Sequence, residues 1–199
     1  MIRKHRDCGN ISVYIRGRKG DAMLKRVAYT FAILVAVILV AGLLLPASAH
    51  VERRIVIRAT PEAVYPYLSD FRKFNQWQPW AKIDPGTRFE YTGDESGVGA
   101  RMTWYGSNPA VNSGSQQIIL AEPPRKVVSQ LEFGEGTVAT STFTLEADGG
   151  NTVITWAYDT EFGYDILARY FGLLLDSWIG RDYEQGLGSL KTLIEGEAS

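Results

Sequence analysis

The chain has 199 residues and a net charge of -1, a size that suits one ordinary domain with a short appendage. Its 22% charged residues argue against wholesale disorder, and Cys8 is the only cysteine, so an intrachain disulfide is excluded. Residues 1–26 carry eight Lys or Arg and two acids, whereas residues 50–199 carry thirteen and twenty. An acidic domain repels phosphate backbones, so we expect no nucleic-acid partner. The basic N-terminal segment, residues 1–26, suits contact with an anionic membrane surface.

Histidine is also scarce in this sequence. The two histidines, His5 and His50, both precede Val51, and the sequence beyond that residue holds neither His nor Cys. This composition excludes a Ser-His-Asp triad, a Cys nucleophile and nearly every zinc site in the body of the domain. We therefore assign no catalytic residue, no metal ligand and no cofactor, and we expect binding rather than catalysis.

Residues 27–45 form an apolar segment of nineteen residues without a charge. At about 1.5 Å per residue a helix of this length spans roughly 28 Å, close to the thickness of a bilayer core. Lys25 and Arg26 flank its start, so the positive-inside rule places the N-terminus in the cytoplasm and the domain on the extracytoplasmic side. We expect a single transmembrane helix, followed by a linker over residues 46–50.

A cleavable signal peptide is the main alternative for this segment. Ala47-Ser48-Ala49 has the small-x-small form that signal peptidase accepts, and cleavage after Ala49 would release a secreted, soluble domain. A nineteen-residue apolar core is long for that role, which favours an uncleaved anchor. A buried core helix is disfavoured because the segment has no polar face.

The basic N-terminal segment, residues 1–26, is expected to be disordered over residues 1–22, which are polar and show no apolar periodicity. Met23-Leu24-Lys25-Arg26 has the form of the beginning of a membrane-targeting leader. We hypothesise that Met23 is the true start, which the mass of the native N-terminus would test.

The domain, residues 51–196, begins with period-two alternation that predicts a strand over residues 51–58. Thr60 and Pro61 then favour a helix start, with a helix to about residue 68 that Pro66 shortens or kinks. A second short helix is predicted over about residues 70–77.

Six further strands and a long C-terminal helix follow. Turn residues separate short alternating runs, and such short connections make consecutive strands antiparallel. The last thirty or so residues have helical spacing, and glycines near residue 172 predict a break there. The pattern predicts an α+β architecture in which a seven-stranded antiparallel sheet wraps around the helix. The six strands are expected over residues 88–91, 100–105, 115–121, 126–133, 138–147 and 152–160.

Short motifs recur along this element order. They are Thr60-Pro61-Glu62, Asp70-Phe71, Trp77 with Pro79-Trp80, Gly97-Val98-Gly99-Ala100 with Trp104, Glu122-Pro123-Pro124, Thr152 to Trp156, Ile179-Gly180 and Gly186-Leu187. In this order they resemble the SRPBCC superfamily of START-like helix-grip proteins, and in particular its polyketide cyclase/dehydrase and lipid transport branch. The leader ending in Leu45-Pro46 is similar to those of membrane-anchored members. The resemblance implies a cavity between sheet and long helix that holds an apolar small molecule, and it leaves enzymatic activity open.

Strand alternation and helical spacing suggest which side chains line such a cavity. Trp77 and Trp80 would lie by its mouth, as a gate or in contact with the bilayer. The alternative is that these side chains only fill the core. The candidate ligand-binding residues are Trp77, Trp80, Met102, Trp104, Phe133, Phe143, Trp156, Tyr158, Tyr170, Leu174 and Trp178.

The leading hypothesis is a membrane-tethered carrier or sensor for a lipid-like or aromatic small molecule. One alternative is a polyketide cyclase or aromatase-like enzyme, which needs an ionisable group in the cavity. Asp159, Glu161, Asp182 and Glu184 are candidates for that group, although a solvated surface is their simpler interpretation. A third alternative is a structural or protein-binding module with a filled core and an exposed apolar patch.

Overall fold

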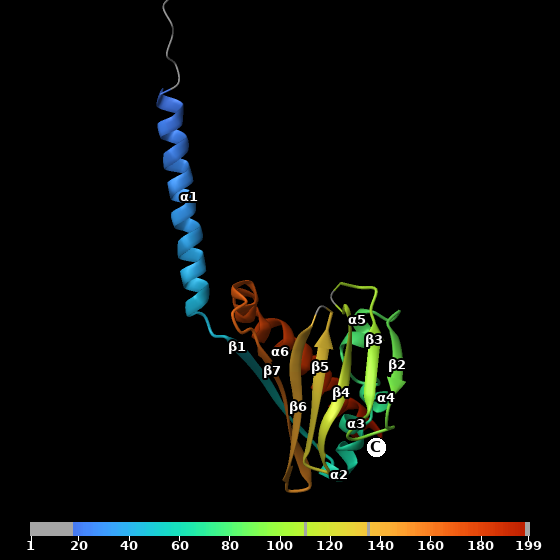
Figure 1. Ribbon diagram of the computed structural model, residues 1–199. Helices are drawn as coiled ribbons and strands as arrows, with labels where there is room; N and C mark the ends of the chain where they lie inside the picture. Colours follow the sequence, from blue (N-terminus) through green and yellow to red (C-terminus); the bar gives the residue numbers. More distant parts are fainter. Residues whose placement is uncertain (1–17, 110, 135, 198–199) are drawn as a thin grey trace, which may run out of the picture. The chain divides into compact units, whose positions relative to one another are not determined.

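The protein is described by a computed structural model covering residues 18–109, 111–134 and 136–197 (Figure 1). The chain divides into two compact units, Met1–Leu44 and Leu45–Ser199.

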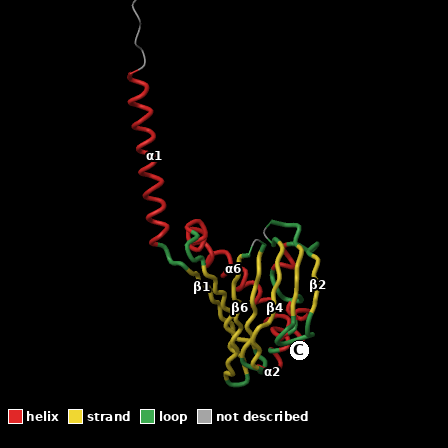
Figure 2. Tube along the Cα trace, viewed as in Figure 1, coloured by secondary structure: helices red, strands yellow, loops and turns green. Residues whose placement is uncertain are grey.

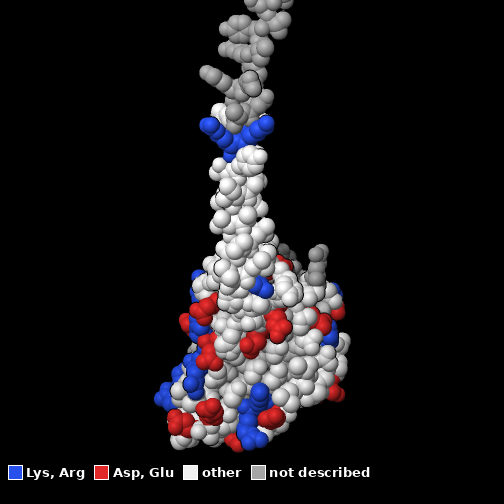
Figure 3. Space-filling view, turned by 60° about the vertical axis from the view of Figure 1, so that its left-hand side comes forward, with Lys and Arg blue, Asp and Glu red and all other residues white. Residues whose placement is uncertain are grey.

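The first unit contains one helix, α1, Arg18–Leu44. Its stretch Met23–Leu44 has a mean hydropathy of 2.7 and is only 6% buried, which is long and apolar enough for a membrane span or a signal sequence. In Figure 3 the visible surface of α1 carries charged side chains only near its start. Disorder was expected over residues 1–22. Residues 1–17 lie outside the described part of the chain, and residues 18–22 are helical.

The second unit is built on a seven-stranded antiparallel sheet, which confirms the expected α+β fold (Figure 1). The strand order is β1-β7-β6-β5-β4-β3-β2, so β2 to β7 form a meander and β1 joins β7. The first strand begins at Ser48, three residues before the predicted start, and therefore includes His50. The strands are β1 Ser48–Ile57, β2 Arg88–Thr92, β3 Arg101–Tyr105, β4 Ser113–Glu122, β5 Lys126–Phe133, β6 Thr137–Asp148 and β7 Asn151–Glu161.

Four short helices link β1 to β2, where the sequence predicted two (Figure 2). Pro66 starts a new helix because proline lacks the N–H that would continue the preceding one. Asp70 caps the third helix, where its Oδ1 accepts a hydrogen bond from the backbone N–H of Arg72 at 2.8 Å. Thr60, the predicted cap of the first helix, makes no side-chain capping bond. The helices are α2 Pro61–Val64, α3 Pro66–Ser69, α4 Phe71–Phe74 and α5 Trp80–Ile83.

The long helix α6, Ile166–Glu197, is continuous, so the predicted break near Gly172 is wrong. Gly172 is needed for packing instead. A Cβ at this position would lie 2.6 Å from Cε2 of the Phe162 ring, so only glycine lets the helix approach the end of β7 this closely. The contact with Phe162 explains why glycine, which has a low helix propensity, occupies this position in α6.

Polar contacts hold α6 against β1. The Arg53 guanidinium reaches Asp176 (Nη1 to Oδ1, 2.9 Å) and Glu184 (Nε to Oε1, 2.7 Å), one helical turn to either side of Gly180. Farther along the helix, Lys191 Nζ donates to the carbonyl oxygen of Val56 at 2.7 Å. Because α6 is fixed along this edge strand, the concave surface of β2 to β5 is left for other side chains to cover.

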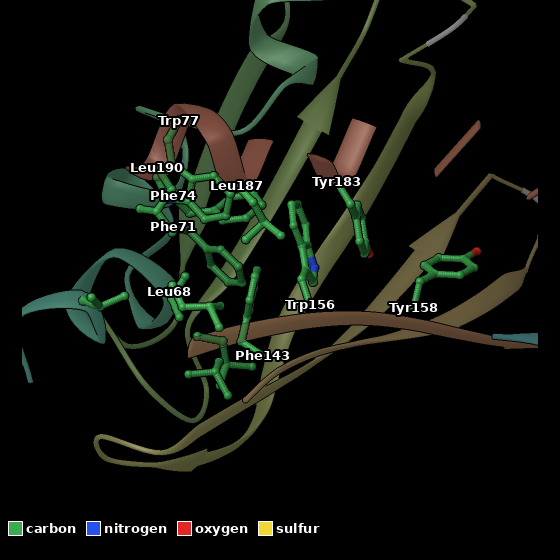
Figure 4. Packing of buried hydrophobic residues seen from close by; sticks show 14 of the residues in the cluster. Leu68, Phe71, Phe74, Trp77, Phe143, Trp156, Tyr158, Tyr183, Leu187 and Leu190 are labelled. Carbon is green, nitrogen blue, oxygen red and sulfur yellow. The ribbon is translucent and has the colours of Figure 1, made fainter. Parts of the chain in front are cut away.

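The core is an aromatic cluster between the sheet and α6 (Figure 4). The Trp156 ring lies between two others, stacked on Tyr183 at 3.6 Å and on Phe143 at 4.8 Å between centroids. Phe74 and Trp77 meet it edge-on at 6.1 and 5.4 Å. The Trp156 indole Nε1–H donates to Ser141 Oγ at 2.8 Å, so this buried ring has its polar atom satisfied.

Candidate ligand-binding cavity

A cavity of about 270 Å³ lies beside this cluster, between the sheet, α6 and the short helices. Five strands and the loop after β3 form its sheet side, while α4, α5, the segment between them and α6 contribute the rest. Its lining residues are Phe74, Gln78, Trp80, Phe89, Met102, Trp104, Val111, Gln116, Leu131, Phe133, Tyr158, Trp178, Ile179, Asp182 and Tyr183.

Strand register explains why these sheet residues meet. Met102 is directly opposite Gln116, and Gln116 is directly opposite Leu131, so the three form one row across β3, β4 and β5. Neighbours in such a row point to the same face of a sheet. Trp104 and Phe133 form the next part of the wall, with their rings edge-on at 5.8 Å.

A β-bulge in β4 changes the expected pattern farther along that strand. The register shifts between Ile118 and Leu120, which pair with Ser129 and Val128. Strict alternation would put Ile118 and Leu120 on one inward face. Ile118 is fully buried, but Leu120 is 38% exposed, because the extra residue in the bulge turns the later part of the strand over.

Gln116 is the main polar group of the apolar wall. Its side chain is 5% exposed, and among the described residues its amide has no hydrogen-bond partner. Gln78 differs, because its Oε1 accepts from the backbone N–H of Trp80 at 2.9 Å and its Nε2 donates to Asn75 Oδ1 at 3.3 Å. An amide that lines a largely apolar cavity gains a hydrogen bond from any polar group placed there, so Gln116 favours a polar group of a bound molecule or a water in this cavity.

The ionisable side chains at the cavity are two tyrosines and one aspartate. Burial raises the pKa of Tyr158 and of Tyr183, so both hydroxyls are neutral at pH 7 and offer hydrogen bonds rather than a base. Asp182 Oδ2 accepts from the Trp80 indole Nε1–H at 3.2 Å. Asp182 is therefore the one carboxylate at the cavity that could serve as the ionisable group of a cyclase-like enzyme. In the described part of the chain, no three His, Cys, Asp or Glu side chains are grouped to hold a metal ion.

The structure divides the expected ligand-binding residues into three groups. Trp80, Met102, Trp104, Phe133, Tyr158 and Trp178 line the cavity. Trp77, Phe143 and Trp156 instead fill the core, because their rings pack against one another and against Phe74. Trp77 is buried and its Nε1 donates to the carbonyl oxygen of Tyr67 at 3.0 Å, so its placement at a cavity mouth is wrong.

Tyr170 and Leu174 of α6 also lie outside the cavity. The reason is the rotation of the helix. Gly172, Gly180 and Gly186 mark the side of α6 that approaches β1, β7 and the core, and Leu174 points away from that side and is 44% exposed. Trp178 is half exposed although it lines the cavity, so it lies at the rim.

Several lining residues escaped the sequence analysis. Alternation along β4 could have identified Gln116, because it lies two residues before the buried Ile118, but a polar residue is not expected in an apolar wall. Tyr183 shares the helical spacing of Leu187 and Leu190 and could have been found from it. Asp182 was a candidate for the ionisable group of a cyclase-like enzyme, with a solvated surface as its simpler interpretation, and it lines the cavity. The remaining ones that were missed are Phe74, Gln78, Phe89, Val111 and Ile179.

The comparison with known families agrees with this geometry. Residues 48–195 match the family described as polyketide cyclase/dehydrase and lipid transport, an SRPBCC-type family. The chain belongs to this family. The match covers the whole unit with the sheet and α6 apart from its ends, which confirms the resemblance inferred from the sequence motifs. No curated protein matches the chain.

Several solved structures have a fold similar to that of this chain. A protein from Rhodobacter sphaeroides is 20% identical, with a TM-score of 0.55 over 74% of this chain and 93% of that one. A protein from Chromobacterium violaceum is 18% identical, with a TM-score of 0.53 over 75% and 99%. Truncated norcoclaurine synthase from Thalictrum flavum is 13% identical, with a TM-score of 0.55 over 74% and 93%. At these identities the likeness shows the helix-grip fold alone.

Proposed function

We propose that this member of the polyketide cyclase/dehydrase and lipid transport family is a membrane-tethered carrier or sensor for a lipid-like or aromatic small molecule. The observation that carries the proposal is the cavity of about 270 Å³, whose apolar wall contains the unpaired amide of Gln116. Sites for small molecules are mostly apolar and have a few polar groups that fix orientation. The neutral hydroxyls of Tyr158 and Tyr183 fit the same role.

The size of the cavity narrows the class of ligand. A volume of about 270 Å³ lies just below the range of about 300–1,000 Å³ typical of sites for drug-sized ligands. It suits a molecule of one or two rings, or a single short acyl chain, and not both acyl chains of a phospholipid. Gln116 lies between Met102 and Leu131, so the ligand would carry one hydroxyl or carbonyl within an otherwise apolar body.

Tethering through α1 is supported by where the possible cleavage site falls in the fold. Cleavage after Ala49 would cut inside β1, where Ser48 pairs with Glu161 and Ala49 with Thr160. It would also remove the carbonyl oxygen of Ala47, which accepts from the backbone N–H of Phe162 at 2.7 Å. A processed chain would lose native pairing at the edge of its sheet, which favours the uncleaved anchor. The basic residues before the apolar segment favour an extracytoplasmic domain.

Two measurements on the full chain in detergent test the cavity. Organic extraction with mass spectrometry should release an apolar molecule from the purified protein. Titration should show that 2-naphthol binds about tenfold more tightly than naphthalene, because one hydrogen bond in a buried site contributes about 0.5–1.5 kcal/mol and leaving the amide unpaired adds to the difference. The substitution Gln116→Leu should abolish that preference.

Gln117→Leu is the matched control, because Gln117 is the next residue of β4 and faces the other side of the sheet, where its Oε1 accepts from Arg101 Nη1 at 3.3 Å. This variant should keep the preference for 2-naphthol. A protein that releases no apolar molecule and binds neither probe would contradict the proposed function.

A further inference from the structure

The first half of α6 presents an unpartnered apolar face. Leu167, Phe171, Leu174 and Trp178 are 67%, 52%, 44% and 46% exposed. Their spacing of four, three and four residues places them on one side of a helix with 3.6 residues per turn. We call these four side chains the apolar stripe. Tyr164, which is 91% exposed, lies just before the helix and extends this surface.

No free charge interrupts this surface. Between residues 166 and 178 the charged residues are Arg169 and Asp176, and both are engaged elsewhere. Arg169 is buried, with its guanidinium donating to the carbonyl oxygens of Gly163 and Leu45. Asp176 pairs with Arg53 of β1, on the opposite side of the helix from the stripe. Exposed apolar surfaces of this kind mark contacts with protein or lipid.

The chain enters the domain beside the first turns of α6. Arg169 lies two residues from Leu167 and from Phe171, on the other side of the helix from the stripe, and donates from Nη1 to the carbonyl oxygen of Leu45 at 3.2 Å. Leu45 is the residue that follows α1 in the sequence. The backbone N–H of Phe162 likewise bonds Ala47 at 2.7 Å. The beginning of α6 is therefore fixed to the segment that continues directly from the apolar helix.

We propose that the apolar stripe is a bilayer-contact surface, with its side chains in the interfacial layer of the membrane. Aromatic and aliphatic residues without charge suit that layer, where Trp and Tyr are enriched. Trp178 belongs both to the stripe and to the cavity lining, so the contact brings the rim of the cavity to the lipid surface. The inference rests on the tethering part of the proposed function, whereas binding in the cavity is independent of it.

Spin labels on the full chain in phosphatidylcholine vesicles test this proposal. Cys8 is the only cysteine, so Cys8→Ser gives a background in which Phe171→Cys can be labelled alone. Ile119→Cys is the matched control, since Ile119 is 49% exposed and lies on β4. The ratio of collision with dioxygen to collision with a water-soluble nickel complex should rise severalfold at position 171 relative to position 119.

The possible outcomes distinguish the bilayer contact from association of two copies of the chain and from a loss of tethering. Equal nickel accessibility at the two positions, in a chain that floats with the vesicles, overturns the bilayer contact alone. Shielding of position 171 from both reagents, with dipolar broadening between labels, overturns it in favour of a second copy of the chain. A chain that does not float with vesicles overturns tethering and the contact together. Titration of the same samples with 2-naphthol reports on the cavity separately.

Discussion

Glu195, near the end of α6, accepts hydrogen bonds from two basic residues. Lys191 Nζ lies 2.6 Å from Oε1, and the backbone N–H of Arg58 lies 2.9 Å from the same atom. The Lys191 ammonium, followed by the backbone and side chain of Arg58, lowers the pKa of Glu195 to about 2. The carboxylate thereby joins the last turns of the helix to the end of β1.

The substitution Glu195→Gln should change how stability depends on pH. The folded pKa of Glu195 is lower than its unfolded value, so the ionised carboxylate stabilises the fold fully above about pH 5. This stabilisation should decline as the pH falls toward about 2. Urea unfolding at a series of pH values should show the wild type more stable at pH 7 and equal to the variant near pH 2. Glu62→Gln, at an exposed position without an ion pair among the described residues, is the control for replacing a surface glutamate by glutamine, and the effect assigned to Glu195 is the part of the change that this variant does not share.

The cavity shows what sequence reasoning captures at the scale of single residues. Alternation correctly turned Met102 and Trp104 inward, because a strand places every second side chain on the same face. It did not separate cavity wall from core, since both are buried and apolar. Trp156 and Tyr158 have the same inward direction on β7, but only Trp156 is enclosed by stacked rings.

Glycine is the residue type whose effect on the long helix α6 was predicted wrongly from the sequence. Low helix propensity at Gly172 predicted a break, yet α6 is continuous because glycine allows close contact with Phe162. Whether the low helix propensity of glycine or the close contact that it allows prevails depends on tertiary packing, which a single sequence does not show. The bulge after Ile118 was missed for a similar reason, because no turn residue marks it.

Two glycines two residues apart in α6 should respond oppositely to alanine. A Cβ on Gly186 would lie 3.0 Å from Pro79 Cδ and 3.1 Å from the Trp156 ring, which cannot move because Phe143 and Tyr183 enclose it. A Cβ on Gly188 meets nothing within 4 Å. Gly188→Ala should stabilise the protein by up to about 1 kcal/mol through helix propensity. Gly186→Ala should destabilise it by about 1–3 kcal/mol through overpacking, as measured by chemical denaturation.

An equal gain in stability from both alanines would contradict the packing assigned to the inner side of α6. Near-UV circular dichroism adds a second readout, because displacement of Trp156 in Gly186→Ala should alter the aromatic signal while Gly188→Ala leaves it unchanged.

At the scale of the whole molecule, all residues of the hydrophobic core belong to the unit Leu45–Ser199. A chain starting at Leu45 should therefore fold and bind 2-naphthol as the full chain does. A chain starting at Val51 loses the pairing of residues 48–50 with β7, and with it about 1–3 kcal/mol, since each backbone hydrogen bond contributes roughly 0.5–1.5 kcal/mol. Thermal unfolding of the two shortened chains measures the difference, and equal stability would show that this pairing contributes nothing.

The order of the elements and the sheet-on-helix architecture followed from the sequence because turn residues and periodicity are local signals. The pairing of β1 with β7 is a long-range contact, which turn residues and periodicity do not predict. The placement of α6 along β1, which leaves room for the cavity, depends on Arg53 and its two acidic partners, which lie more than a hundred residues away in the sequence.

The two edges of the sheet are held very differently. Strand β1 is paired with β7 and joined to α6 by Arg53 and Lys191, whereas the short strand β2 pairs with β3 alone in the sheet and is linked outside it by the hydrogen bond from Asn75 to the Tyr91 hydroxyl. Phe89 of β2 is part of the cavity wall. Fewer contacts therefore restrain β2 than β1, and we expect a bulky ligand to be accommodated by outward movement of β2 and not by movement of α6.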